Sequence, residues 1–183
     1  MFDKVERFVI DAFTEAGALS NISHHQRTVY WIKKLKPDAD EALLIAGIAH
    51  DIERAFYGDW KKGSDDPALL RKHQDLSAVD IEKFLRHEGA EEELIARVKH
   101  FVANHETGGD EDQNVLCDAD CLAFLEEKAV SLAKKSMRDG STSEAGRRIR
   151  MVFHRISSPF AKQIAQPWYE EAKKYLTEMS TFS

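Results

Sequence analysis

The sequence has few cysteines and lacks long apolar runs, and both absences exclude classes of protein. Cys117 and Cys121 lie four residues apart in the run VLCDADCLAFL, where a helix would place them on one face as small buried side chains. They predict no disulfide framework, and unpaired thiols favour a reducing compartment. No segment approaches the roughly 20 apolar residues of a membrane span, and charges interrupt the N-terminal run MFDKVERFVIDAF, unlike in a signal peptide. We therefore expect a cytoplasmic protein with no membrane partner.

Basic residues are not in excess. Lys and Arg number 26 and Asp and Glu number 32, which gives a formal net charge of −6. Binding to a nucleic-acid backbone needs a clustered basic surface, and the basic residues are scattered except around Arg147, Arg148 and Arg150. An amphipathic helix with solvated arginines explains this cluster better than a phosphate-facing patch does. We expect no extended nucleic-acid surface.

The period-two alternation of half-buried strands is also lacking, whereas apolar residues recur at spacings of three and four, which predicts helices. The first expected helix covers 2–16. The second is capped by Asn21 or Ser23 and ends before Pro37, and the third runs from Asp38 or Asp40 to His50-Asp51. Helical periodicity continues at 69–85 and 94–102, and further helices are expected at about 113–136, 144–157 and 161–179. This pattern predicts an all-α bundle that forms one domain over residues 1–183. The C-terminal helices at 144–179 are expected to pack on the bundle or on a second subunit, which leaves a homodimer open.

Several histidines and carboxylates fall among apolar residues. His73 and His105 lie three or four residues from apolar neighbours and are expected to face inward. Asp51 closes an apolar helix directly after His50, and Asp120 lies in another apolar helix, where a carboxylate is costly to bury unless it is paired or binds a metal. One inward histidine alone is more often a hydrogen-bonded core residue. Several such groups from separate helices are more simply explained by a metal site.

The order and local context of these residues resemble a known family. His24 and Arg27 open an amphipathic helix, and the other polar residues lie in the runs IAGIAHDIER, HQDLSAVDIEKFL, VANHE and LCDADCL. Over about residues 20–130 this pattern resembles the HD-domain superfamily of metal-dependent phosphohydrolases, including its two-metal subset. The resemblance implies an HD-domain-like helical bundle.

The resemblance also implies a ligand set for one or two divalent ions. The first ion would be held by His24, His50, Asp51 and Asp120, and the second by His73, His105 and a bridging Asp51. Neutral imidazoles and carboxylates suit Mn, Fe, Co, Ni or Zn, so ligand type does not identify the metal. The sequence leaves open whether His24 or His25 is the first ligand. Counting from His24 places Ile32 and Leu35 where the family has apolar residues, which favours His24.

The implied activity is hydrolysis of a phosphate ester or anhydride, with a nucleotide or another small phosphorylated metabolite as substrate. Metal-activated water would be the nucleophile, and Asp51 a catalytic residue. Arg27, one helical turn from His24, is the nearest candidate to bind phosphate and stabilise its charge. Arg54 and Lys99 are weaker candidates for substrate binding, since surface ion pairs explain them equally well. No general acid is assigned.

Two other functions fit the same residues. Some proteins that resemble the two-metal subset use a mixed-valent di-iron centre to activate oxygen, and the same six ligands would serve an oxygenase. The other function is a regulatory module that binds a nucleotide without turnover. The six candidate ligands weigh against this function, because a purely structural metal needs only four protein ligands. In the loop at 57–67, Trp60 with Lys61 or Lys62 is a further candidate to cover the substrate.

Overall fold

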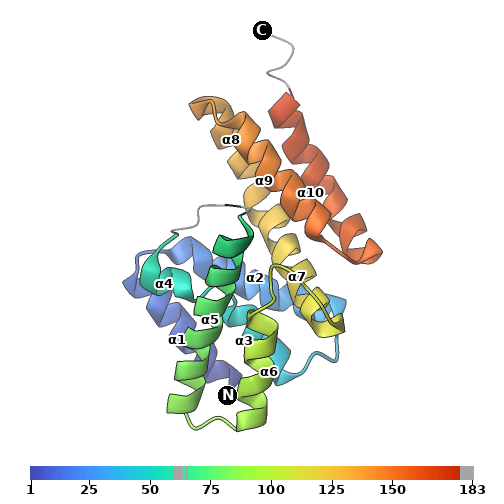
Figure 1. The fold of residues 1–183 in the computed structure, drawn as a ribbon. Helices are drawn as coiled ribbons and strands as arrows, with labels where there is room; N and C mark the ends of the chain where they lie inside the picture. The colour runs from blue at the N-terminus through green and yellow to red at the C-terminus, as the bar shows by residue number, and fades with distance from the viewer. Residues whose placement is uncertain (60–63, 65, 178–183) are drawn as a thin grey trace. The chain divides into compact units, whose positions relative to one another are not determined.

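The computed structural model describes residues 1–59, 64 and 66–177, and within these ranges it contains helices but no strands (Figure 1). The predicted all-α class is therefore confirmed. The helical elements are α1 (Phe2–Glu15), α2 (Leu19–Leu35), α3 (Glu41–Ala49), α4 (Glu53–Tyr57), α5 (Pro67–His87), α6 (Glu92–Val102), α7 (Glu111–Phe124), the π-helical turn η1 (Leu125–Ala129), α8 (Val130–Asp139), α9 (Thr142–Arg155) and α10 (Pro159–Thr177). Among the described residues, no helix combines the length and the apolar character that crossing a membrane requires.

The chain divides into two compact units, Met1–Asp120 and Cys121–Ser183. The first unit contains α1 to α6 and most of α7, and it holds every residue that the sequence nominated as a metal ligand. The second unit contains η1 and α8 to α10. The single domain expected over residues 1–183 stays a prediction.

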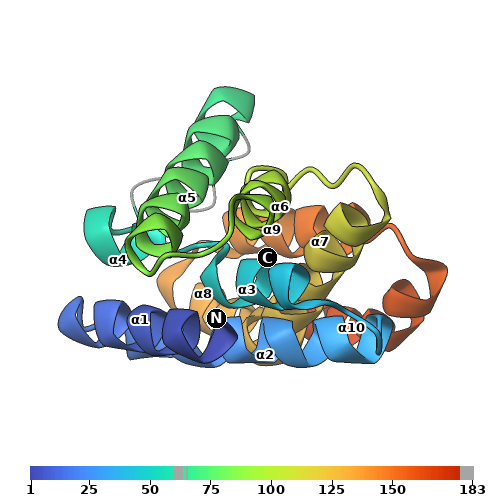
Figure 2. The same cartoon turned by 90° about the horizontal axis from the view of Figure 1, so that it is seen from below.

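Helix α3 is the centre of the first unit. Asp40 caps it, because its side chain accepts a hydrogen bond from the Leu43 amide at 3.1 Å, as one of the two predicted starts requires. Its side chains are buried on every side except at Leu44 and Glu41. Helices α1, α2 and α6 pack around it (Figure 2). A helix covered on all sides has little freedom to shift, so its end is a rigid place for polar groups.

Gly47 sets the distance between α2 and α3. A Cβ at this position would overlap Cδ1 of Ile32 and touch Cγ2 of Val29 at 3.5 Å, so the α3 backbone lies directly against α2. Ile32 is fully buried and Val29 nearly so. Because α2 carries His24 and α3 leads into His50, this close approach also fixes how near the two histidines lie.

The start of α2 and the place of His105 differ from the sequence prediction. Helix α2 begins at Leu19 with Ala18 before it, so neither Asn21 nor Ser23 is its cap, and His24 lies in its second turn. The reason is Gly17, whose positive φ of 67° turns the chain sharply enough for a new helix to begin at once. Helix α6 ends at Val102, where the predicted periodicity also ends, but His105, which helical spacing placed on an inward face, lies in the turn after the helix.

The second unit confirms the two predicted C-terminal helices to within a few residues, at α9 and α10. Phe153 of α9 stacks on Tyr169 of α10, with ring centroids 4.1 Å apart and planes at 7°. Ile149 and Ala172 are fully buried in the same unit. The single helix expected at about 113–136 is instead α7, the π-helical turn and α8, with bounds 111–139.

Substitution of Gly47 tests whether the contact between α2 and α3 holds the first unit together. Gly47→Leu is expected to lower the free energy of unfolding by about 1–3 kcal/mol or more, because the added side chain has no space beside Ile32 and Val29. Gly47→Ala is the matched control, since the end of the Ile32 side chain can rotate away and alanine favours the helix by up to about 1 kcal/mol. Urea unfolding checks both. Equal stabilities of the two variants would contradict the tight contact.

Candidate metal centre

Polar side chains from five segments of the first unit converge where α3 ends. His50 is the C-cap of α3 and Asp51 follows it. The other predicted ligands come from α2, α5, the turn after α6, and α7, namely His24, His73, His105 and Asp120. His50, His73 and His105 are completely buried, and His24 and Asp51 are each 4% exposed. The structure thus brings together all six residues that the sequence nominated.

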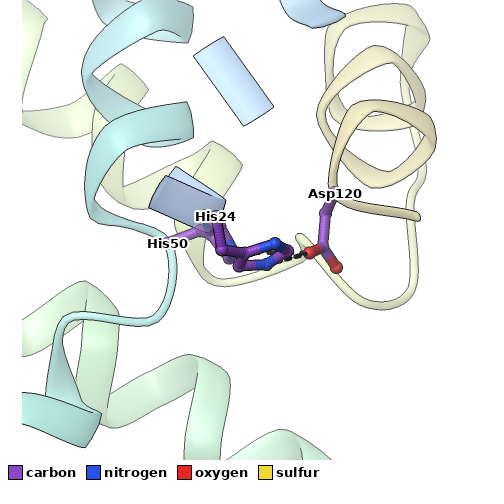
Figure 3. Close-up of side chains that lie close together, drawn as sticks. All are labelled: His24, His50 and Asp120. Atoms are coloured by element: carbon purple, nitrogen blue, oxygen red, sulfur yellow. Dashed lines mark ion pairs between the residues drawn. The ribbon is translucent and has the colours of Figure 1, made fainter. Parts of the chain in front are cut away.

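His24, His50 and Asp120 form one group whose ligand atoms lie within 4.8 Å of one another. Nε2 of His24 is 2.9 Å from Oδ1 of Asp120, and Nε2 of His50 is 3.4 Å from the same oxygen. Figure 3 shows both rings directed at the Asp120 carboxylate, which extends from α7. Two imidazoles and a carboxylate at this spacing could hold a divalent ion.

Asp51, His73 and His105 form a second group of the same kind. Oδ1 of Asp51 lies 2.8 Å from Nε2 of His73 and 3.3 Å from Nε2 of His105. The other oxygen of Asp51, Oδ2, is 3.9 Å from Nε2 of His50, which belongs to the first group. The Asp51 carboxylate therefore lies between the two groups and faces both.

Backbone carbonyls fix the orientation of the histidine rings. Nδ1 of His50 donates a hydrogen bond to the Gly47 carbonyl at 2.9 Å, and Nδ1 of His105 donates to the Val102 carbonyl at 2.7 Å. A carbonyl oxygen can only accept, so each Nδ1 carries a proton and, in the neutral ring, Nε2 presents its lone pair. Both Nε2 atoms are buried without a hydrogen bond and face carboxylate oxygens. Lone pairs directed at anionic oxygens need a cation between them, and these residues fit a metal ion.

The charges in the cluster favour a cation as well. Burial alone would raise the pKa of the Asp51 carboxyl, but Arg54, His50 and His73 outweigh it and hold that pKa well below its usual range. Burial likewise opposes ionisation of Asp120, whose pKa is held low by His24 and His50. Burial would lower the pKa of His50, yet Asp51 and Asp120 raise it above its ordinary value. The two carboxylates thus stabilise positive charge at His50 in the interior of the unit.

His25, the alternative first ligand, is also buried, at 1% exposure. Its Nδ1 donates to the Ile48 carbonyl at 2.8 Å, and it forms a third group with His50 and Asp51. Burial, followed by the nearby His50 and His24, holds the pKa of His25 well below its usual value, so its ring is neutral. His24 differs from His25 because its Nε2 faces Asp120.

The three predicted substrate-binding cations lie in different surroundings. Arg54 forms an ion pair of 2.9 Å between its guanidinium and Oδ2 of Asp51, and its side chain is 16% exposed. The guanidinium of Arg27 lies over the Tyr30 ring, 4.0 Å from the centroid. Lys99 lies 2.5 Å from a Glu82 oxygen on the surface. Arg54 therefore contacts the cluster directly, while Trp60, Lys61 and Lys62 lie outside the described residues.

Sequence reasoning missed two carboxylates beside the second group. Glu53 is 1% exposed, and its Oε1 lies 2.6 Å from Nδ1 of His73 on the side away from Asp51. Burial raises the pKa of Glu53, although His73 opposes the shift. Glu106 has an oxygen 3.7 Å from Nε2 of His73. The sequence suggested a surface ion pair for Arg54, which directly follows Glu53, and the only sequence signal for Glu106 was its place directly after His105.

Alanine variants of His24 and His25 separate the two candidates for the first ligand. His24→Ala is expected to lose about one metal equivalent per chain, because its ring faces Asp120. His25→Ala is expected to retain its metal, because it is His24 whose Nε2 lies 2.9 Å from the Asp120 carboxylate. His87→Ala, whose side chain is 84% exposed, is the control. Elemental analysis of protein loaded with Mn²⁺ and freed of excess ion checks all three, and loss of metal in His25→Ala alone would reverse the assignment.

Comparison with known proteins found a match to one family model. The family model described as a domain of unknown function, DUF4202, matches residues 11–167, which covers both units in large part and all six clustered residues. A search of curated proteins and a search of solved structures each found no match. Because the family model spans well over half of the sequence, the chain belongs to the DUF4202 family.

Proposed function

We propose that this chain is an HD-type, divalent-metal-dependent phosphohydrolase that cleaves a phosphate ester or anhydride of a nucleotide or another small phosphorylated metabolite. The observation that carries the proposal is the pair of buried histidine and carboxylate groups, with Asp51 of the second group also facing His50 of the first. A cytoplasmic location, in keeping with the free thiols of Cys117 and Cys121, belongs to the same proposal.

The ligand set accounts for the chemistry that the proposal needs. His24, His50 and Asp120 would hold one ion, and His73 and His105 a second, with Asp51 facing both. When bound, one or two divalent ions would lower the pKa of a water molecule and offset negative charge on a phosphate. The residues themselves hold the site in shape, since the Nδ1 atoms of His50 and His105 are fixed on carbonyls and cannot rotate freely.

Arg54 supports phosphate as the substrate group. A guanidinium has five N–H donors, and its ion pair with Asp51 leaves others to bind phosphate oxygens. Arg54 and Asp120, at 16% and 15% side-chain exposure, are more accessible than the completely buried histidines. A substrate would therefore approach the cluster from the side of Arg54 and Asp120, with Arg27 a further candidate on α2.

The proposal is tested by phosphate release from phosphomonoesters, nucleotides and cyclic phosphodiesters, with added Mn, Co, Ni, Mg or Zn. We expect turnover that chelation abolishes and metal restores, and no turnover in Asp51→Ala. Arg54→Ala is expected to lower kcat/KM by about 100-fold or more, because a charge that stabilises the phosphate is lost. Arg86→Ala is the matched control, since Arg86 forms surface pairs with Glu82 and Glu92.

Other outcomes of the same experiment would replace the proposal. Tightly bound iron with an oxygen-dependent reaction and no phosphate release would identify an oxygenase. Nucleotide binding without any turnover, under every metal, would identify a regulatory module. Full activity of Asp51→Ala with its metal content intact would show that the site lies elsewhere.

A further inference from the structure

We propose that Glu106 is a ligand of the second metal ion, which gives that ion two imidazoles and two carboxylates from His73, His105, Asp51 and Glu106. The inference rests on the metal centre of the proposed function and extends it, since the resemblance implies no role for Glu106. It is carried by the place of the Glu106 carboxylate relative to Nε2 of His73.

Two carboxylates converge on the same imidazole nitrogen. Nε2 of His73 lies 2.8 Å from an Asp51 oxygen and 3.7 Å from Oε1 of Glu106. His73 is completely buried, and the Glu106 side chain is only 7% exposed. A carboxylate withdrawn from water next to another carboxylate is costly unless a cation lies between them.

The backbone holds Glu106 at this position. Its amide donates a hydrogen bond to Oε1 of Gln74 at 3.1 Å, and Gln74 is 1% exposed and adjacent to His73 on α5. The turn is closed by the Gly108 amide, which donates to the Asn104 carbonyl at 2.8 Å. The side chains of His105 and Glu106 therefore extend from the same hydrogen-bonded turn. The hydrogen bond to Gln74 holds this turn beside His73.

The balance of charge around His73 fits a divalent ion. Asp51, Glu53 and Glu106 place three carboxylates there, and Arg54 contributes a positive charge at Oδ2 of Asp51. A divalent ion beside these carboxylates would offset part of their negative charge. Nε2 of His105, buried without a hydrogen bond, faces the same place and supplies a nitrogen ligand.

The two ligand groups then differ in chemistry. The first has two imidazoles and Asp120, whereas the second, with Glu106, adds a second carboxylate of its own. Carboxylates favour harder ions such as Mn²⁺ over softer ones. Mn²⁺ is therefore the probe for the test, because it should occupy the second group well.

Titration of chelator-treated full-length protein with Mn²⁺, followed by calorimetry and elemental analysis, tests the assignment. Wild type is expected to bind about two ions, and Glu106→Gln to bind the second at least about tenfold more weakly, the loss that follows when even an outer partner of a metal site is removed. Glu111→Gln, at an 87% exposed side chain, is the matched control and is expected to bind like wild type. Glu106→Asp is expected to recover part of the lost affinity.

Thermal unfolding separates a ligand from a residue that only supports the fold. In chelator, Glu106→Gln is expected to be at least as stable as wild type, because one of several neighbouring negative charges is removed. The increase in Tm on adding Mn²⁺ is expected to be smaller than in wild type. A purely structural role predicts the reverse, a lower Tm in chelator with an unchanged increase.

Four results would overturn the inference. The first three are a wild-type chain that binds fewer than about two ions, wild-type affinity for the second ion in Glu106→Gln, and the thermal pattern of a structural residue. Loss of phosphate release in Glu106→Gln with both ions retained would also overturn it, and would assign Glu106 to proton transfer. None of these results decides the proposed function, which fails only if metal-loaded wild type releases no phosphate.

Discussion

The first unit depends on how it neutralises one buried carboxylate. Asp51 is 4% exposed, and its two oxygens lie within 4 Å of His50, His73, His105 and Arg54, which come from four segments of the chain. An unpaired carboxylate in this position would cost several kcal/mol. Each segment that supplies a partner must therefore be held in place, and the packing of α2, α3, α5 and α6 around this point does so.

Apolar packing offsets the free-energy cost of burying these charged groups. Helix α3 is buried on nearly all sides, and α1, α2 and α6 surround it. Full burial of a large aliphatic side chain stabilises a fold by about 1.5–3 kcal/mol, and Leu43, Ile45 and Ile48 are all at most 1% exposed. The same helix that supplies this stability ends at His50, so the polar cluster is attached to the most firmly packed element of the unit.

Much of the cluster could be predicted from the sequence, because helical periodicity shows which polar residues face apolar ones. The all-α class and the inward orientation of His73 followed from that spacing, and Asp40 is one of the two helix starts that the sequence left open. The start of α2 and the position of His105 in a turn did not, since Gly17 and the turn after Val102 act through backbone geometry that side-chain patterns do not encode. Glu53 and Glu106 were missed for a related reason. A charged residue beside another charge resembles a solvated pair in sequence, and only tertiary packing buries it.

The turn positions of His105 and Glu106 also bear on how the site works. Successive residues of a helix are rotated by about 100° about its axis, so adjacent side chains point in different directions. A turn, by contrast, can direct adjacent side chains toward one point. His50 and Asp51 lie just past α3, and His105 and Glu106 lie just past α6, so both adjacent pairs are at helix ends. Each end also exposes carbonyls with no helical partner, and those of Gly47 and Val102 accept from the histidine Nδ1 atoms. The ends of α3 and α6 thus supply two pairs of neighbouring side chains and the carbonyls that orient their histidines, while His24, His73 and Asp120 reach the same cluster from within helices.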